Sequence, residues 1–272
     1  MISFKMGLPG LYKKDSNTKS ADSDGGFTLV EVLIAMLLSG IVLTSIYSAF
    51  QSQQDSYVAQ EQVSEMQQNV RIGLDMLARD IRLAGYNPDG GAGTGFVDNI
   101  AFGGVQVFTN ATQIAFTADL DGDGAIDVVT QDVNGNGSID LADLERIAYS
   151  LNGTNLQRWT TGAVSWQTVA EHVENVEFQY VLANGTQTTT PAAAQLANIR
   201  SVRISILVST ENPDPNFTNP RTYLPASNDP YFTSPANQSG TVWGPFAGTA
   251  TANFRRRLLT ITVNCRNMGL SG

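Results

Sequence analysis

The chain has 272 residues, 42% of them hydrophobic, and a formal charge of −9 at neutral pH. That length accommodates one sizeable domain with an appendage, or two small domains. The excess of acidic residues argues against a nucleic-acid-binding protein, because such proteins usually carry a basic surface. It is consistent with an exported head domain or a cation-binding surface. The single cysteine, Cys265, excludes an intramolecular disulfide and leaves either an unpaired thiol or a bond between chains.

An apolar segment from Gly26 to Gln51 contains one charged side chain, that of Glu31. A helix of about 24 residues rises roughly 36 Å, which is enough to cross a bilayer core. The segment follows Lys5, Lys13, Lys14 and Lys19, so the positive-inside rule predicts a cytoplasmic N-terminus and an exported remainder. We predict one transmembrane span at 27–50. A cleaved secretory signal fits less well, because the apolar run is too long and its glycine pair precedes it.

Beyond the span, apolar residues recur at spacings of three and four, with Gln, Asn, Arg and Asp on the other face. Gly85 followed by Pro88 is a stop signal. The sequence therefore predicts one continuous helix from about Phe27 to Ala84, half in lipid and half against a soluble domain. The expected buried stripe is Val63, Met66, Val70, Leu74, Leu77, Ile81 and Ala84.

The stretch GGFTLVEVLIAML, residues 25–37, resembles the class III signal of type IV prepilins and type II secretion pseudopilins. The resemblance rests on the basic leader, the Gly-Phe junction, Thr-Leu, the glutamate and the apolar helix. It implies that a prepilin peptidase cuts between Gly26 and Phe27 and then N-methylates Phe27. Residues 1–26 are then a leader peptide and residues 27–86 the N-terminal pilin helix.

A carboxylate in hydrocarbon is costly, so Glu31 is a functional candidate with a partner to be found. The resemblance implies that Glu31 neutralises the N-terminal amine of a neighbouring subunit in a filament. Two opposite charges that are each costly in lipid become tolerable when paired. The alternative is that Glu31 faces lipid headgroups or a water defect without a partner.

Residues 87–272 read as a β-rich head. Runs rich in Val, Ile, Phe and Tyr, bounded by turn signals, predict strands. Asn152-Gly153 and Asn184-Gly185 are hairpin turn signals. We expect an α+β fold in which the long N-terminal helix packs on an antiparallel β-sheet head, as in type IV pilins. The expected strands lie at 105–109, 112–118, 146–151, 155–159, 173–182, 199–208 and 256–265.

Two features near the C-terminus remain open. The segment 212–248, rich in Pro, Asn, Ser, Thr and Gly, reads as a long loop that covers its own domain or contacts a partner subunit. We expect the three arginines at the start of the last strand to be exposed to solvent: Arg255, Arg256 and Arg257. The alternative is that they bind an anionic partner.

The strand sequences at 173–185, 199–208 and 254–267 resemble the head of PilW-type minor pilins, which are related to the J-type minor pseudopilins of type II secretion. With the N-terminal signal, the resemblance covers most of the chain.

The sequence of residues 119–143 predicts calcium binding, because calcium-binding loops place oxygen ligands at positions 1, 3, 5, 7, 9 and 12 and a glycine at position 6. Counted from Asp132, that set is complete, with Gly137 at the turn, and it resembles the loops of dockerin modules. The predicted ligands are Asp132, Asn134, Asn136, Ser138 through its carbonyl, Asp140 and Asp143.

A first loop counted from Asp119 is less complete, because Thr130 stands where a bidentate carboxylate belongs. The alternative for the whole stretch is an acidic turn held by Asx hydrogen bonds without a metal. Crowded carboxylates repel one another without a cation, so we expect a structural calcium site that holds the loop between two strands in place. The carboxylates of the first loop are Asp119, Asp121, Asp123 and Asp127.

No catalytic constellation assembles. His172 is the only histidine, which excludes paired-histidine zinc motifs, and it reads as a surface residue beside a strand. Phosphate-loop, nucleophile-elbow and dinucleotide motifs are absent from the sequence. We expect a protein that is not an enzyme.

The sequence thus predicts a minor type IV prepilin in the bacterial inner membrane, with its head exported, that joins other minor and major pilins to prime pilus assembly and sits at the tip. One alternative is a minor pseudopilin of a type II secretion system. Another is a membrane-anchored, calcium-dependent adhesin that never enters a filament.

Overall fold

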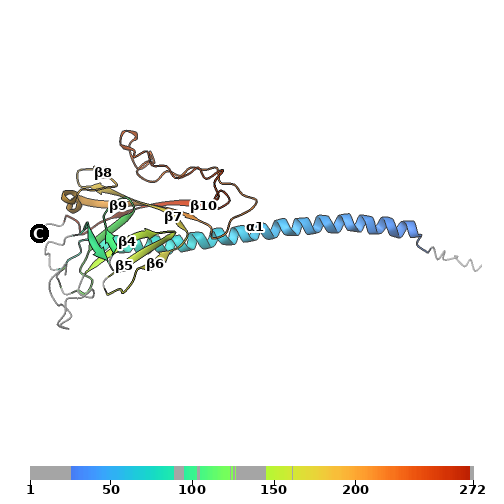
Figure 1. The fold of residues 1–272 in the computed structure, drawn as a ribbon, viewed down its shortest axis with the longest axis horizontal. Coiled ribbons are helices and arrows are strands. Elements are labelled where there is room, and N and C mark those ends of the chain that lie inside the picture. Colours follow the sequence, from blue (N-terminus) through green and yellow to red (C-terminus); the bar gives the residue numbers. More distant parts are fainter. Residues whose placement is uncertain are drawn as a thin grey trace, which may run out of the picture. The chain divides into compact units, whose positions relative to one another are not determined.

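The computed structural model describes residues 26–88, 95–102, 105–122, 124, 126, 145–160 and 162–269. The chain divides into two compact units, Met1–Gln54 and Asp55–Gly272. Helix α1 spans Leu29–Leu83 and belongs to both (Figure 1). The predicted continuous helix is confirmed with its ends within two residues. Every residue of α1 in the first unit is exposed, and the helix is long and apolar enough to cross a membrane.

In the second unit, α1 buries one face. Six of the seven residues of the predicted stripe are buried, and Val63 is partly buried against the same core. The 3.6-residue period of the helix places these positions in one line, so burying them removes a continuous apolar strip from water. The stripe prediction is confirmed.

The head contains two four-stranded antiparallel sheets and a two-stranded ribbon. One sheet, called here the β3–β6 sheet, runs in the order β3-β4-β5-β6: Gln113–Thr117, Arg146–Asn152, Asn155–Thr160 and Gln167–Ala170. The other, the β7–β10 sheet, runs in the order β10-β9-β7-β8: Arg256–Asn264, Ile199–Ser209, Val173–Leu182 and Gln187–Thr188. The ribbon pairs β1, Ile100–Phe102, with β2, Val105–Val107. Short 3-10 helices occupy Ala193–Asn198 and Pro235–Asn237.

The seven predicted strands are present, and three short strands, β1, β6 and β8, were not predicted. The expectation of one antiparallel sheet needs correction, because the strands divide between two sheets. A pattern of period two shows which residues of a strand share a face, but it does not choose the neighbouring strand. The antiparallel α+β class is confirmed.

Both predicted hairpin turns are present. Asn152 pairs with Asn155 at the end of the β4–β5 hairpin, where Gly153 has φ of 61°. At the β7–β8 turn, Gly185 has φ of 82°, and the Leu182 N–H donates to the Thr186 carbonyl at 2.8 Å. These positive φ angles favour glycine, which explains why Asn-Gly pairs mark both turns.

One hydrophobic core joins the second half of α1 to both sheets (Figure 1). The helix contributes Leu77 and Ile81, the β3–β6 sheet Phe116, and the β7–β10 sheet Phe178 and Ile204, all fully buried. Because each sheet offers only alternate residues to this core, the opposite faces need other cover. On the β3–β6 sheet a second apolar cluster includes Phe102 of the ribbon and Trp159.

The outer face of the β7–β10 sheet carries polar residues, and the long loop covers them. Ser227 of the loop donates to the Glu177 carboxylate through its N–H at 3.0 Å and its hydroxyl at 2.7 Å. Gln179 donates to the Thr233 hydroxyl at 2.8 Å, and Arg203 donates to the Phe232 carbonyl at 2.7 Å. The loop therefore covers its own domain, the first of the two roles that the sequence left open.

Two ionic groups are buried where the sequence placed them in solvent. Asp80 of α1 is 6% exposed and accepts hydrogen bonds from Tyr149 and Arg158. The side chain of Arg256 is 0% exposed and donates from Nε to Glu174 at 2.6 Å. The prediction of a solvated arginine edge is wrong at Arg256, and Asp80 is buried although it lies outside the predicted apolar stripe. A tertiary partner compensates each charge, so the charge tolerates burial.

Candidate functional site

The N-terminal end of α1 holds the residues that the sequence singled out for processing. Gly26 and Phe27 precede the helix, and Phe27 is 81% exposed. Thr28 caps the helix: its hydroxyl accepts a hydrogen bond from the Glu31 N–H at 3.2 Å, and its carbonyl accepts the Val32 N–H at 3.2 Å. The peptide bond between Gly26 and Phe27 therefore lies outside the helix, where helical structure does not shield it from a peptidase.

Thr28 and Glu31 have the spacing of a capping box, in which a threonine caps the helix and a glutamate follows three residues later. This capping role was not predicted, although Thr-x-x-Glu is its sequence signal. The acid also lies in the first helical turn, where the helix dipole favours negative charge. The first turn of α1 is therefore a favourable position for the Glu31 carboxylate even before a second chain is considered.

Phe27 and Glu31 line one hollow on the surface of α1, together with Ala35, Ser39 and Gly40. The Glu31 side chain is exposed on that face, and its carboxylate has no ion pair among the residues that the structure describes. An exposed carboxylate beside small side chains can accept a cation carried by a second helix. The geometry brings the predicted cleavage site and the predicted pairing residue onto one surface.

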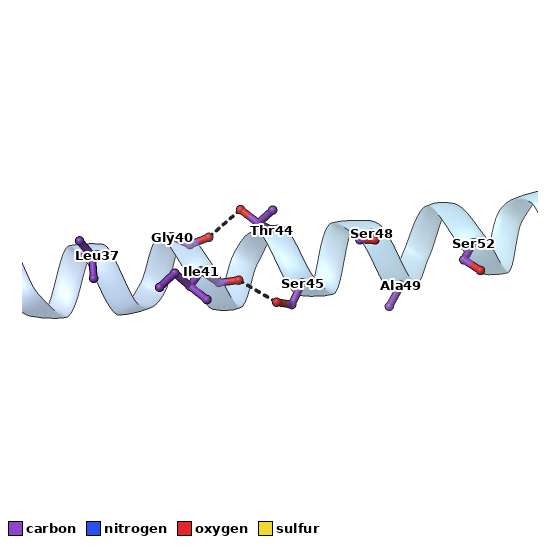
Figure 2. A pocket seen from close by; sticks show the side chains of 8 residues that line it. All are labelled: Leu37, Gly40, Ile41, Thr44, Ser45, Ser48, Ala49 and Ser52. Atoms are coloured by element: carbon purple, nitrogen blue, oxygen red, sulfur yellow. Dashed lines mark hydrogen bonds between the residues drawn. The ribbon is translucent and has the colours of Figure 1, made fainter.

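A second hollow on the same helical segment is formed mainly by small residues (Figure 2). Thr44 donates its hydroxyl to the Gly40 carbonyl at 2.8 Å, and Ser45 donates to the Ile41 carbonyl at 2.9 Å. Hydroxyl groups satisfied by their own helix add little polarity, and small side chains let another helix approach closely. Ser48, Ala49 and Ser52 extend this face (Figure 2).

At the end of β3, three carboxylates converge. Oxygen atoms of Asp119, Asp121 and Glu145 lie within 4.8 Å of one another. Asp119 and Glu145 are 5% and 3% exposed, whereas Asp121 is exposed. Glu145 lies directly before β4, so the antiparallel pairing of β3 with β4 brings it next to Asp119.

Backbone N–H groups orient these carboxylates. Glu145 Oε1 accepts from Leu120 at 2.5 Å and from Asp121 at 3.0 Å. Asp119 accepts from Gly122 at 2.6 Å and from Gly124 at 3.0 Å. The donor set consists of hard oxygens, which are the ligands that calcium prefers, and three carboxylates can supply part of its six to eight ligands.

The predicted calcium ligands divide into two groups. Asp119 and Asp121 are described and lie together, as predicted for the first loop. The others lie outside the described residues: Asp123, Asp127, Asp132, Asn134, Asn136, Ser138, Asp140 and Asp143. Glu145 was missed, because the loop pattern ends at position 12 and only strand pairing brings Glu145 back to Asp119.

His172 lies in the connection between β6 and β7, with φ of 56°, and its carbonyl accepts the Ser209 N–H at 3.0 Å. This contact joins the connection to the end of β9. The backbone of His172 makes this contact, and the residue is half-buried rather than exposed.

Two family models match parts of the sequence. A family model described as Type IV Pilus-assembly protein W, PilW, matches residues 131–267, about half of the chain. The chain belongs to the PilW family. A model of the prokaryotic N-terminal methylation motif also matches the PilW-family chain at residues 22–47, which include Gly26, Phe27 and Glu31. Both matches confirm the resemblance seen in the sequence.

Among solved structures, the PilW-family chain is similar to the type IV-like pilin TTHA1219 from Thermus thermophilus, with 14% identity and a TM-score of 0.40. The similarity covers 74% of this chain and 96% of that pilin. A search of curated protein sequences finds no match. Membership of the PilW family points to a structural component of pilus assembly.

Proposed function

We propose that this PilW-family chain is a minor pilin that is cut between Gly26 and Phe27, methylated at Phe27 and built into a type IV pilus. The observation that carries the proposal is the methylation-motif match at 22–47, placed at the start of an exposed apolar helix. In this account the helix spans the inner membrane with the head exported, and the chain then leaves the membrane for the filament. Its partners are the prepilin peptidase and other minor and major pilins.

Glu31 makes the proposed assembly step specific. Cleavage creates an α-amine at Phe27, and in lipid an unpaired ammonium and an unpaired carboxylate are each unfavourable. Pairing Glu31 with the amine of an adjacent chain neutralises both, so the correct axial register of two helices is stabilised. Substituting Glu31→Leu should reduce incorporation into filaments, whereas undiminished incorporation would refute the pairing role.

We further propose that calcium stabilises the head at the acidic loop. Three carboxylates oriented within 4.8 Å repel one another unless a cation or protons offset their charge. A calcium ion held by Asp119, Asp121 and Glu145, with ligands from the following loop, would fix the connection between β3 and β4. This role is structural, because the site links two strands of one sheet.

The proposed place of the chain is the assembly-priming complex of minor pilins, with retention at the pilus tip. The family description names pilus assembly, which favours a pilus over the type II secretion alternative. The calcium-dependent adhesin alternative differs in one measurable respect: it needs no cleavage, so its leader remains attached.

Mass spectrometry of the N-terminus of the native protein tests the proposal. The expected result is a chain that begins with N-methylated Phe27, and a native chain that retains residues 1–26 contradicts it. A Gly26→Leu variant should keep the leader, and Gly40→Ala, inside α1, should be processed normally. The four lysines of the chain, Lys5, Lys13, Lys14 and Lys19, all lie in the leader, so the mature chain should also lack lysine.

A further inference from the structure

A small pocket in the second unit is separate from the features above. One wall is the start of the second-unit part of α1, with Asp55, Val58 and Ala59. The other wall is the loop that follows β9, with Pro213, Pro215 and Asn216. The cavity volume is about 150 Å³. The pocket has room for one long side chain.

The loop wall of the pocket is held in place by an ion pair. Arg255 donates to Asp214 Oδ2 from Nε at 2.9 Å and from Nη2 at 2.7 Å, and its guanidinium lies 4.5 Å from the centre of the Phe217 ring. The Asp214 N–H donates to the Asn253 carbonyl at 2.8 Å. Because backbone and side-chain contacts both fix the loop, the pocket is formed in advance of any occupant.

The charge of the pocket is not balanced. Partial burial acts to raise the pKa of Asp214, but hydrogen bonds from Arg255 and from the Asn216 N–H outweigh it and hold the pKa below its usual value. Asp214 and Arg255 therefore compensate each other. Asp55 accepts a hydrogen bond from Asn216 Nδ2 at 3.5 Å and has no ion pair among the described residues. One negative charge thus remains at the pocket.

We propose that this Asp55 pocket receives an arginine or lysine side chain from an adjacent pilin-type subunit. The cationic group pairs with Asp55, and the aliphatic stem lies against Val58, Ala59 and the two prolines. Arg and Lys commonly bury their stems on apolar surface while the charged end keeps polar partners. The pocket then fixes which subunit docks and in which register, since complementary charge contributes specificity more than affinity.

A lipid headgroup amine is a poorer occupant. The amine of phosphatidylethanolamine is tethered closely to a phosphate, whose negative charge would face the carboxylates of Asp55 and Asp214. Arg255 offers little compensation because its charge is already paired with that of Asp214. Charge complementarity therefore favours a protein cation without a neighbouring anion.

The inference rests on the proposed filament function, and a photocrosslinker placed in the full-length chain tests it. Benzoylphenylalanine replaces Val58, which lines the pocket, or Tyr57, which is exposed beside it. In isolated filaments we expect the Val58 probe to join a peptide of another pilin-type subunit that contains Arg or Lys. Adding Asp55→Asn should lower the yield about threefold or more. Glu61→Gln, an exposed acid outside the pocket, should leave the yield unchanged.

Crosslinks confined to lipid or to the same chain, or a yield that Asp55→Asn leaves unchanged, overturn the inference. The filament content of the chain is measured in parallel, so that normal incorporation without the crosslink removes the pocket proposal and leaves the proposed function intact. Ala59→Leu fills the pocket without changing charge and should also lower the yield. If Asp55→Asn fails to fold, the crosslinking yield of Ala59→Leu shows whether the pocket receives the side chain.

Discussion

The Asp80 carboxylate lies 2.6 Å from Nε of Arg158, and the Tyr149 hydroxyl donates to the same Asp80 oxygen at 2.6 Å. This arrangement fastens α1 to β4 and β5 by ionic and hydrogen-bonding contacts inside the main core. The side chains of Arg158 and Asp80 are 18% and 9% exposed, so water competes little for either charge. Burial and the Asp80 charge both raise the pKa of Tyr149, which keeps its hydroxyl protonated as a donor.

Replacing Asp80 should destabilise the head. Asp80→Ala leaves the Arg158 guanidinium and the Tyr149 hydroxyl without their acceptor, which costs about 2–4 kcal/mol in free energy of unfolding. Chemical denaturation of the processed full-length protein in detergent, followed by tryptophan fluorescence, measures this change. Asp75→Ala, an exposed position on the same helix, should change stability by less than about 0.5 kcal/mol. Equal effects of the two substitutions would show that the buried contacts contribute nothing specific.

Cys265 should be unreactive in the folded protein. The residue is 4% exposed, and burial raises the pKa of its thiol to about 12, so little thiolate forms at neutral pH. Maleimide should modify the native protein slowly and the denatured protein quickly, and non-reducing gels should show no dimer through this residue. Rapid modification of the native protein, or a Cys265-linked dimer in filaments, would contradict the buried position.

Glu177 should make stability depend on pH in a defined direction. Burial raises its pKa above the ordinary value of 4.5, although hydrogen bonds from Ser227 lower it in part. The contribution of Glu177 to the free energy of unfolding is therefore fully present below the pKa that Glu177 has in the unfolded chain. It is lost as the pH rises through the pKa that Glu177 has in the folded protein.

The comparison with Glu177→Gln isolates this effect, because glutamine can accept from the Ser227 N–H and donate to its hydroxyl. From about pH 4 to about pH 8 the stability of the unsubstituted protein should fall relative to that of Glu177→Gln. Unfolding free energies at several pH values measure the difference. Glu171→Gln, at an exposed position, serves as the control and should show no such trend. If the stability difference between the unsubstituted protein and Glu177→Gln stays constant as the pH rises, the pKa of Glu177 is not raised. The same holds if the difference changes in favour of the unsubstituted protein.

Local patterns predicted the elements well and the long-range contacts poorly. The stripe from Val63 to Ala84 was readable because a helix repeats every 3.6 residues, and both Asn-Gly turns were readable because they need positive φ. Asp80 and Arg158 are 78 positions apart in the chain, and Arg256 is 82 positions from Glu174. A charged residue reads as exposed until its partner is known, so these buried pairs could not be predicted. Glu145 was missed for the same reason.

Calcium should stabilise the head through the acidic loop. A ligand that binds only the folded state at about 100 times its dissociation constant adds about 2.7 kcal/mol, which for a domain of this size raises the melting temperature by roughly 5 °C or more. Glu145→Gln should reduce this calcium-dependent increment, measured as the difference between calcium and chelator. Glu211→Gln, an exposed acid elsewhere, should not change it. Identical melting temperatures in calcium and in chelator would dismiss the site.

The proposed pairing of Glu31 with the amine created by cleavage in an adjacent chain can be detected by zero-length carbodiimide crosslinking of assembled filaments. This reagent joins a carboxylate to an amine in contact with it, and a mature chain starting at Phe27 would carry no lysine to compete. We expect a crosslinked peptide that joins Glu31 to the first residue of a neighbouring pilin, and we expect Glu31→Gln to abolish it. Filaments that contain the chain but never yield this peptide, together with normal incorporation of Glu31→Gln, would rule out the pairing.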